Sequence, residues 1–230
     1  FMWLNASPLV NYAAKSKAVW GQPCPVFVRA IGMEGGGVGH TASGTLHSPF
    51  MHTPGLLVAA PMTPGEYEEV WQRFMAGHDP VYCSEHRRSF RIDHEMPSIE
   101  RQRSDVTVVM VSAARLEGQE ACKILARSWI PCDEFHVLWL KPFEPPAALL
   151  RSLHHTRLGL VVDSDHELCG AARSIAYELS RRTGVPVHAL GREAGRWEAL
   201  RETAERLIDS GYADAAKVVK TLGAFALPIE

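Results

Sequence analysis

Hydrophobic positions in the first part of the chain alternate between helical spacing and short apolar runs, which predicts helices that feed strands. Between residues 64 and 77 the apolar side chains recur on one helix face. Thr63 directly before Pro64 marks the start of that helix, because threonine caps helices and proline fits their first turn. The pattern predicts helices over residues 5–20, 43–52 and 64–77, and strands over residues 25–30, 56–60 and 80–83.

The same alternation resumes at residue 106 and continues almost to the end of the chain. Short β-rich runs separated by helices of ten or more residues favour a mostly parallel sheet that is covered on both faces. The pattern predicts strands over residues 106–111, 135–140, 158–162 and 185–189, and helices over residues 117–129, 146–155 and 169–183. An amphipathic C-terminal helix follows, with Trp197, Leu200, Ala204, Leu207 and Ile208 on one face.

The segment between these two halves has a different character. Residues 86–104 contain five arginines and little apolar periodicity, which is typical of a solvated connector. We therefore predict an α/β protein of two mostly parallel three-layer sandwich domains. The first occupies residues 1–85, the linker 86–104, and the second 105–230 with a helical tail.

Composition and charge argue against a nucleic-acid-binding protein and against a membrane-spanning one. The 24 basic and 26 acidic residues nearly balance, so we expect no nucleic-acid partner, and no apolar run is long enough for a membrane span. Five scattered cysteines are expected to be reduced thiols in the cytoplasm, with the mitochondrial matrix as the alternative. The chain starts at Phe1 rather than at a methionine, and we expect that an upstream segment is missing.

A glycine-rich segment after the first strand is the first candidate for chemistry. Gly35 to Gly39 do not follow the spacing of a dinucleotide-binding loop, but a loop this free of side chains lets the backbone approach a ligand closely. His40, His47 and His52 follow at spacings that do not share a helix face, so we expect no metal site. Two interpretations of these histidines stay open: one of them faces a ligand, or all are ordinary surface residues.

Two polar clusters end predicted strands and form a second candidate. Glu85 and His86 end the strand at 80–83, and residues 163–167 end the strand at 158–162. Carboxylates at these positions could perform acid–base chemistry or cap the following helix, and we favour capping for residues 163–167.

Ordered segments along the chain resemble the beta subunit of thiamine-diphosphate-dependent 2-oxoacid dehydrogenases. In the first half these are NYAAK at 11–15, PVFVR at 25–29, the glycine loop, FMHTPGLLVAAPMTP at 50–64, DPVY at 79–82 and EH at 85–86. In the second half DVTVV at 105–109, LWLKPF at 138–143 and LGLVVD at 158–163 are similar to the transketolase C-terminal domain.

The resemblance implies a shared active site. In that family the first domain of the beta subunit, a thiamine-diphosphate pyrimidine-binding domain that would be partial here, holds the aminopyrimidine ring. An alpha subunit holds the diphosphate through a divalent metal such as Mg²⁺. A beta-subunit glutamate, which the family places upstream of Phe1, protonates the pyrimidine before the cofactor attacks the 2-oxo acid. The resemblance thus implies thiamine diphosphate, an alpha partner and a second copy of the chain.

Individual site residues follow from the same resemblance. Phe1 falls where the family has an aromatic residue against the pyrimidine, so it is expected to bind the cofactor. The family's loop histidine aligns with Ala42, which cannot donate a proton, and we expect His40 to be the catalytic substitute. His47 is the second candidate for this loop or substrate role. It ranks below His40 because it lies where a short helix is expected to begin turning one side toward the core.

Three functions remain open at this point. The first is the beta component of a 2-oxo acid dehydrogenase or decarboxylase that is active only with its alpha partner. The second is a beta-like interaction or assembly chain without catalysis, which Ala42 favours. The third is a transketolase-like enzyme, against which the near-neutral charge argues.

Overall fold

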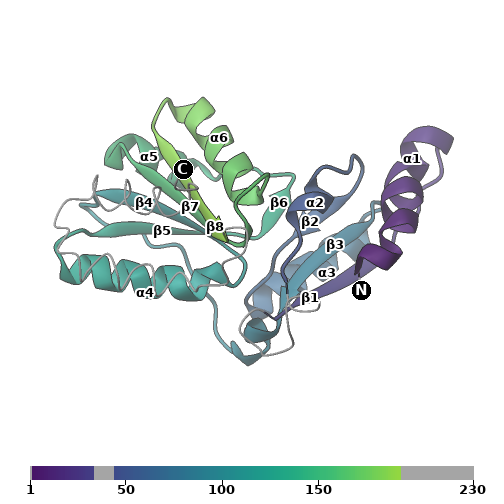
Figure 1. The fold of residues 1–230 in the computed structure, drawn as a ribbon, viewed down its shortest axis with the longest axis horizontal. Coiled ribbons are helices and arrows are strands. Elements are labelled where there is room, and N and C mark those ends of the chain that lie inside the picture. Colours follow the sequence, from purple (N-terminus) through teal and green to yellow (C-terminus); the bar gives the residue numbers. More distant parts are fainter. Residues whose placement is uncertain (1, 34–43, 193–230) are drawn as a thin grey trace, which may run out of the picture. The chain divides into compact units, whose positions relative to one another are not determined.

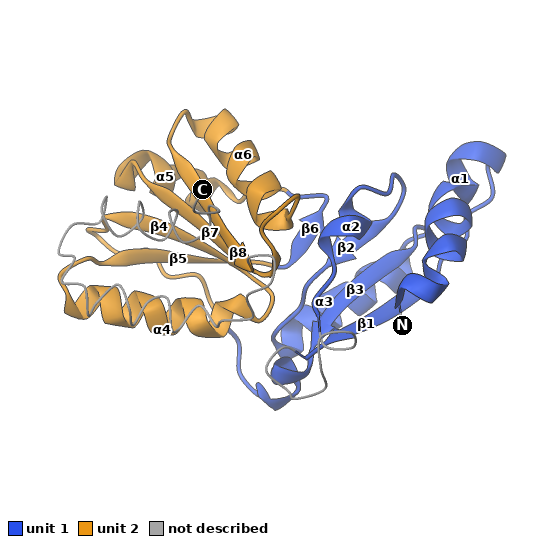
Figure 2. Cartoon of the chain, viewed as in Figure 1, with its two compact units in different colours: residues 1–96, 138–143 blue, residues 97–137, 144–230 orange. Residues whose placement is uncertain are grey.

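The computed structural model describes residues 2–33 and 44–192, which form two compact α/β units (Figure 1). Phe1, the glycine loop with His40 and Ala42, and the predicted helix around Trp197 lie outside the described residues. The two units are residues 1–96 with 138–143, and residues 97–137 with 144–230 (Figure 2). The domain limits of 85 and 105 and the hinge between them stay predictions.

Unit 1 combines short N-terminal helical segments with a four-stranded sheet. Its parallel strands β1, β3 and β2 are joined at one edge by the antiparallel strand β6, in the order β1-β3-β2-β6. The elements are η1 Met2–Asn5, η2 Pro8–Ala13, α1 Ala14–Trp20, β1 Phe27–Gly32, α2 Ser48–Met51, β2 Leu57–Ala59, α3 Pro64–Ala76, β3 Val81–His86, η3 Arg87–Arg91 and β6 Trp139–Lys141.

Helix α3 begins where the sequence predicts. Thr63 and Glu66 form a capping box, and Glu66 Oε2 accepts hydrogen bonds from the amides of Met62 and Thr63. Val70 on the inner face of α3 packs in a buried cluster with Ala59, Val81 and Cys83, and so attaches the helix to the sheet.

The predicted single strand over 135–140 is wrong, because the chain changes sheets at Leu138. β5 ends at Val137 in unit 2, and β6 pairs with β2 in unit 1, where the Leu138 carbonyl accepts from the Ala60 amide at 2.8 Å. Trp139 then holds α3: its indole nitrogen donates to Glu69 at 2.7 Å, and the guanidinium of Arg73 lies 4.1 Å from its ring centroid.

Unit 2 is a fully parallel four-stranded sheet in the order β5-β4-β7-β8. Helix α4 covers one face, while α5 and α6 cover the other, which gives the three layers that the alternation predicts (Figure 1). Its elements are β4 Val106–Val111, α4 Ala114–Arg127, β5 Cys132–Val137, α5 Ala147–Thr156, β7 Gly159–His166, α6 Ala171–Thr183 and β8 Val187–Arg192.

Element limits differ from the prediction mainly at the carboxyl ends of strands. β3 and β7 continue to His86 and His166 and so include their polar clusters. Helix α4 starts at Ala114, three residues before the predicted position. All five cysteines are free thiols. Within residues 2–33 and 44–192, no helix combines the length and apolar character that crossing a membrane requires.

Candidate functional site

The candidate site of unit 1 is built around the carboxyl ends of its parallel strands. β1 ends at Gly32, directly before the glycine-rich segment, and β3 ends in Glu85 and His86. Parallel sheets carry their ligands at this edge, because the loops that leave all the strands converge there. Phe1 and His40, the predicted cofactor-binding and catalytic residues, lie outside the described residues, so their roles stay predictions.

His47 lies inside the described part and is completely buried. It directly precedes α2, and its Nδ1 lies 3.1 Å from Oγ of Ser84, a buried residue of β3. The prediction that a short helix buries this histidine is confirmed. Its proposed loop or substrate role stays a prediction, and the hydrogen bond to Ser84 gives the ring a fixed orientation from which a proton could be passed.

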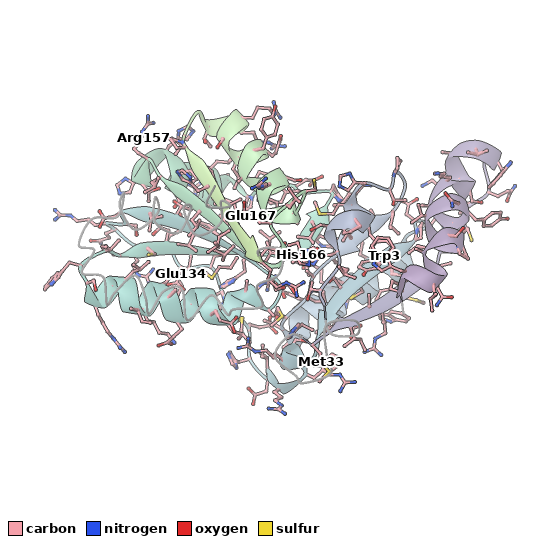
Figure 3. The ribbon with its side chains drawn as sticks, viewed as in Figure 1. Trp3, Met33, Glu134, Arg157, His166 and Glu167 are labelled. Carbon is pink, nitrogen blue, oxygen red and sulfur yellow. The ribbon has the colours of Figure 1, made fainter. Side chains whose placement is uncertain are left out.

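An aromatic stack runs from the N-terminal segment to the sheet. The ring of Trp3, which Figure 3 labels, lies 5.6 Å from that of Phe50 in α2, and Phe50 stacks on Tyr82 of β3 at 4.1 Å. The Tyr82 hydroxyl donates to the Leu46 carbonyl at 3.3 Å. These contacts fix the segment that begins two residues after Phe1 onto α2 and β3.

The side chains of Arg29, in the middle of β1, and Glu85, near the end of β3, join these two strands. Nε and an Nη nitrogen of Arg29 donate to the two oxygens of Glu85 at 2.6 and 2.8 Å, a bidentate pair. The hydrogen bond to Glu85 raises the pKa of Arg29, so the guanidinium stays charged. The Glu85 side chain is only 1% exposed, whereas that of Arg29 is 60% exposed.

The neighbouring thiol and phenol are held neutral. Burial raises the pKa of Cys83 to about 12, and burial likewise raises the pKa of Tyr67. The Tyr67 hydroxyl lies 2.7 Å from that of Ser89, which donates to the His86 carbonyl. Neither group therefore offers a thiolate or phenolate at neutral pH.

Sequence reasoning missed Arg29 and Ser84. Arg29 did have a signal in the sequence: it is a charged residue inside a run that otherwise predicts a buried strand. A charge in such a position requires a partner. No signal marked Ser84, since a serine in a strand is common. No group of three or more histidine, cysteine or acidic side chains within the described ranges could hold a metal ion.

The first unit of the chain matches a known protein domain. The model of the transketolase pyrimidine-binding domain matches residues 1–92. The beta subunit of 2-oxoisovalerate dehydrogenase from Bacillus subtilis (strain 168) is 28% identical over 186 residues, covering 72% of this chain and 54% of that protein. The mitochondrial beta subunit of the human (Homo sapiens) pyruvate dehydrogenase E1 component is 24% identical over 166 residues, which cover 63% of this chain and 46% of that protein. The chain spans about half the length of these curated relatives.

Solved structures have the same fold. A split-gene transketolase, described as an inactive beta4 tetramer, matches with a TM-score of 0.66 at 17% identity, over 96% of this chain and 71% of that chain. A transketolase from Campylobacter jejuni subsp. jejuni matches with a TM-score of 0.57 at 14% identity, over 84% of this chain and 30% of that chain. At these identities the likeness establishes the architecture alone.

Proposed function

Since residues 1–92 are a transketolase-type pyrimidine-binding domain in a distant homologue of 2-oxoacid dehydrogenase beta subunits, we propose that this chain is the beta component of such an enzyme. The enzyme would decarboxylate a 2-oxo acid with thiamine diphosphate, at an active site shared with an alpha partner. We place it in the cytoplasm, together with a second copy of the chain.

The ordered match over residues 1–92 is the observation that supports this proposal most strongly. It covers the first helical segments, the parallel strands and the capped helix α3 in one continuous stretch. The match of curated beta subunits over 60% or more of the chain extends the likeness into unit 2.

The described residues support the proposed role of Phe1 in one respect. The stack of Trp3, Phe50 and Tyr82 attaches the segment that follows Phe1 to α2 and β3, and so anchors the chain next to the residue proposed to lie against the pyrimidine. When bound, thiamine diphosphate supplies the electron sink for decarboxylation.

The chain's own residues have defined tasks in this proposal. Phe1 excludes water from one face of the pyrimidine, which strengthens local electrostatic interactions. His40 holds or moves a proton near the reacting carbonyl, because an imidazole exchanges protons in the neutral range. The Arg29–Glu85 pair ties β1, which leads into the glycine-rich segment, to the end of β3.

A second candidate function is an interaction or assembly chain without catalysis. Ala42 supports it, because alanine stands where the family carries its loop histidine. The two functions make opposite predictions for turnover in the reconstituted complex.

Reconstitution of the chain with its alpha-type partner tests the proposal. We expect release of carbon dioxide from a 2-oxo acid that requires thiamine diphosphate, and His40→Ala should lower turnover about 100-fold, as expected for the loss of one acid–base group. His78→Ala is the matched control, because His78 is an exposed histidine of the same unit. No turnover in the complete complex would favour the assembly function, whereas full turnover of the His40→Ala variant would make His40 a surface residue.

A further inference from the structure

Unit 2 carries buried polar atoms without hydrogen-bond partners at one edge of its sheet. Among the described residues, the hydroxyls of Ser112 and Ser164 and both ring nitrogens of His136 are buried and make no hydrogen bond. Ser112 follows β4 with only 1% of its surface exposed, His136 is next to last in β5, and Ser164 lies near the end of β7. Because buried polar groups are almost always satisfied, three such residues at the ends of three adjacent strands require an explanation.

The strand order identifies this edge as the place where such a sheet binds ligands. In the order β5-β4-β7-β8, the connection from β4 leads to β5 on one side, and β7 lies on the other side. The direction of winding therefore changes between β4 and β7, and ligands of doubly wound sheets bind outside the carboxyl ends of the strands at this point. Ser112 follows β4 and Ser164 lies near the end of β7, the two strands that flank this point, and Figure 3 labels His166 and Glu167 at the end of β7.

The backbone at Ser112 is also unusual. Its φ of 53° lies in the left-handed region, which costs a residue with a side chain about 1 kcal/mol. This turn leads directly into α4, a helix of 14 residues whose N-terminus carries a partial positive charge. The strained turn places the serine at the junction of the strand and this helix.

A buried cationic group lies at the same edge, next to the His136 ring. Arg115, in the first turn of α4, is completely buried and donates to the Val137 carbonyl at the end of β5. Burial, and secondarily the charge of Arg115, lower the pKa of His136 to about 4, so its ring is neutral and offers one donor and one acceptor.

The acidic side chains at the end of β7 and just after it receive hydrogen bonds from neighbouring backbone amides or from α6. Asp163 accepts from the Asp165 amide at 3.2 Å, and Asp165 accepts from the His166 amide at 2.7 Å. Glu167 accepts two hydrogen bonds from Arg173 of α6. The side chains at the edge that lack partners are thus hydroxyls and an imidazole, next to a helix N-terminus and a buried guanidinium.

From this arrangement we propose that the carboxyl edge of the unit 2 sheet binds the phosphate group of a small molecule, with Ser112, His136 and Ser164 as hydrogen-bonding partners. A phosphate group has several acceptor oxygens and can receive donors from three strands at once. The proposal goes beyond the thiamine-diphosphate reaction and does not depend on it.

Titration with inorganic phosphate tests the site in the full chain. At constant ionic strength, with sodium chloride as reference, we expect saturable phosphate binding by calorimetry and a shift of the His136 ring resonances in NMR spectra. Ser112→Ala and His136→Gln should each weaken the phosphate affinity at least tenfold. If one of these variants does not fold, Ser164→Ala replaces it. His188→Gln, an exposed histidine of β8, is the matched control and should bind within about twofold of the native chain.

Two results would overturn the proposal. One is a response to phosphate that chloride reproduces at equal ionic strength. The other is an unchanged His136 resonance in the native chain at phosphate concentrations that saturate binding, which would place any binding elsewhere.

Discussion

Glu85 is a buried carboxylate at the end of β3, and Arg29 gives it two hydrogen bonds from the neighbouring strand. Such a carboxylate is costly when its cationic partner is removed, because its desolvation is no longer compensated. The exposed pair of Lys17 and Asp79, at 2.9 Å, has no such dependence, since water solvates both groups. Two ion pairs in the same unit thus differ in their expected contribution to stability.

Replacing Arg29 measures this difference. Arg29→Met keeps the apolar stem but removes the charge, and we expect the free energy of unfolding to fall by about 2 kcal/mol. Lys17→Met is the control and should change it by about 0.5 kcal/mol or less. Urea denaturation of the three proteins gives both numbers, and equal effects of the two substitutions would show that burial of Glu85 does not matter.

His136 provides a pH-dependent test at the same scale. Its pKa is lowered from 6.5 to about 4 by burial, so the unfolded chain binds the proton more tightly than the folded chain. The neutral ring therefore contributes stability above pH 6.5, and this contribution, up to about 3 kcal/mol, is lost as the pH falls from 6.5 toward 4. In phosphate-free buffer, His136→Gln should lose less stability than the native chain over this window. Parallel curves for the two proteins would contradict the buried, neutral state of the ring.

At the scale of elements, the sequence predicted most helices and strands because local signals agree with the final packing. Thr63 before Pro64 and the apolar face that follows suffice to define α3. The break between β5 and β6 had no such signal, since residues 135–140 form one continuous β-rich run. Pairing of β6 with β2, a contact distant in sequence, decides where the strand ends.

The candidate sites were predictable to a smaller extent. Resemblance brought out His47, and the structure places it beside Ser84, but nothing in the local pattern links positions 37 residues apart. Ser112 and His136 were missed for the same reason, because the edge that they share with Ser164, a member of the predicted polar cluster 163–167, exists only once β4, β5 and β7 are aligned. The left-handed backbone at Ser112 likewise has no sequence signal, since this conformation favours glycine.

The segment between the units allows a proteolytic test. Arg87, Arg91 and Arg103 are exposed, and η3 is a single short helical segment, so we expect limited trypsin digestion to cut within residues 87–103 first. Glu95 holds the segment through Thr63 and the Gly65 amide, and Glu95→Ala should therefore accelerate the cut. Mass spectrometry of the first fragments identifies the site. First cuts within residues 106–192 would contradict a separable boundary here.

At the scale of the whole molecule, unit 1 exposes large apolar side chains along its N-terminal segments. Trp3, Leu4, Tyr12, Val19 and Trp20 are each more than half exposed. Large apolar side chains exposed in this number on neighbouring segments are a feature of protein interfaces, which agrees with the proposed partner dependence.

Sedimentation velocity tests this dependence on other chains. We expect association that increases with concentration at micromolar levels, and Trp20→Lys should reduce it. Trp129→Lys is the control, because Trp129 is an isolated, 90% exposed side chain of unit 2. A stable monomer at all concentrations, also when the alpha-type partner is present, would remove the basis for a shared site.

Calorimetric titration of thiamine diphosphate, with Mg²⁺ present, tests the central claim most directly. If the active site is shared, the equimolar mixture of this chain with its alpha-type partner should bind the cofactor at least tenfold more tightly than either chain alone. Phe1→Ala should weaken binding in the mixture and leave the weak binding by the partner alone unchanged, since only the mixture contains Phe1. Equal affinity of the partner alone and of the mixture would contradict the claim that this chain contributes to the cofactor site.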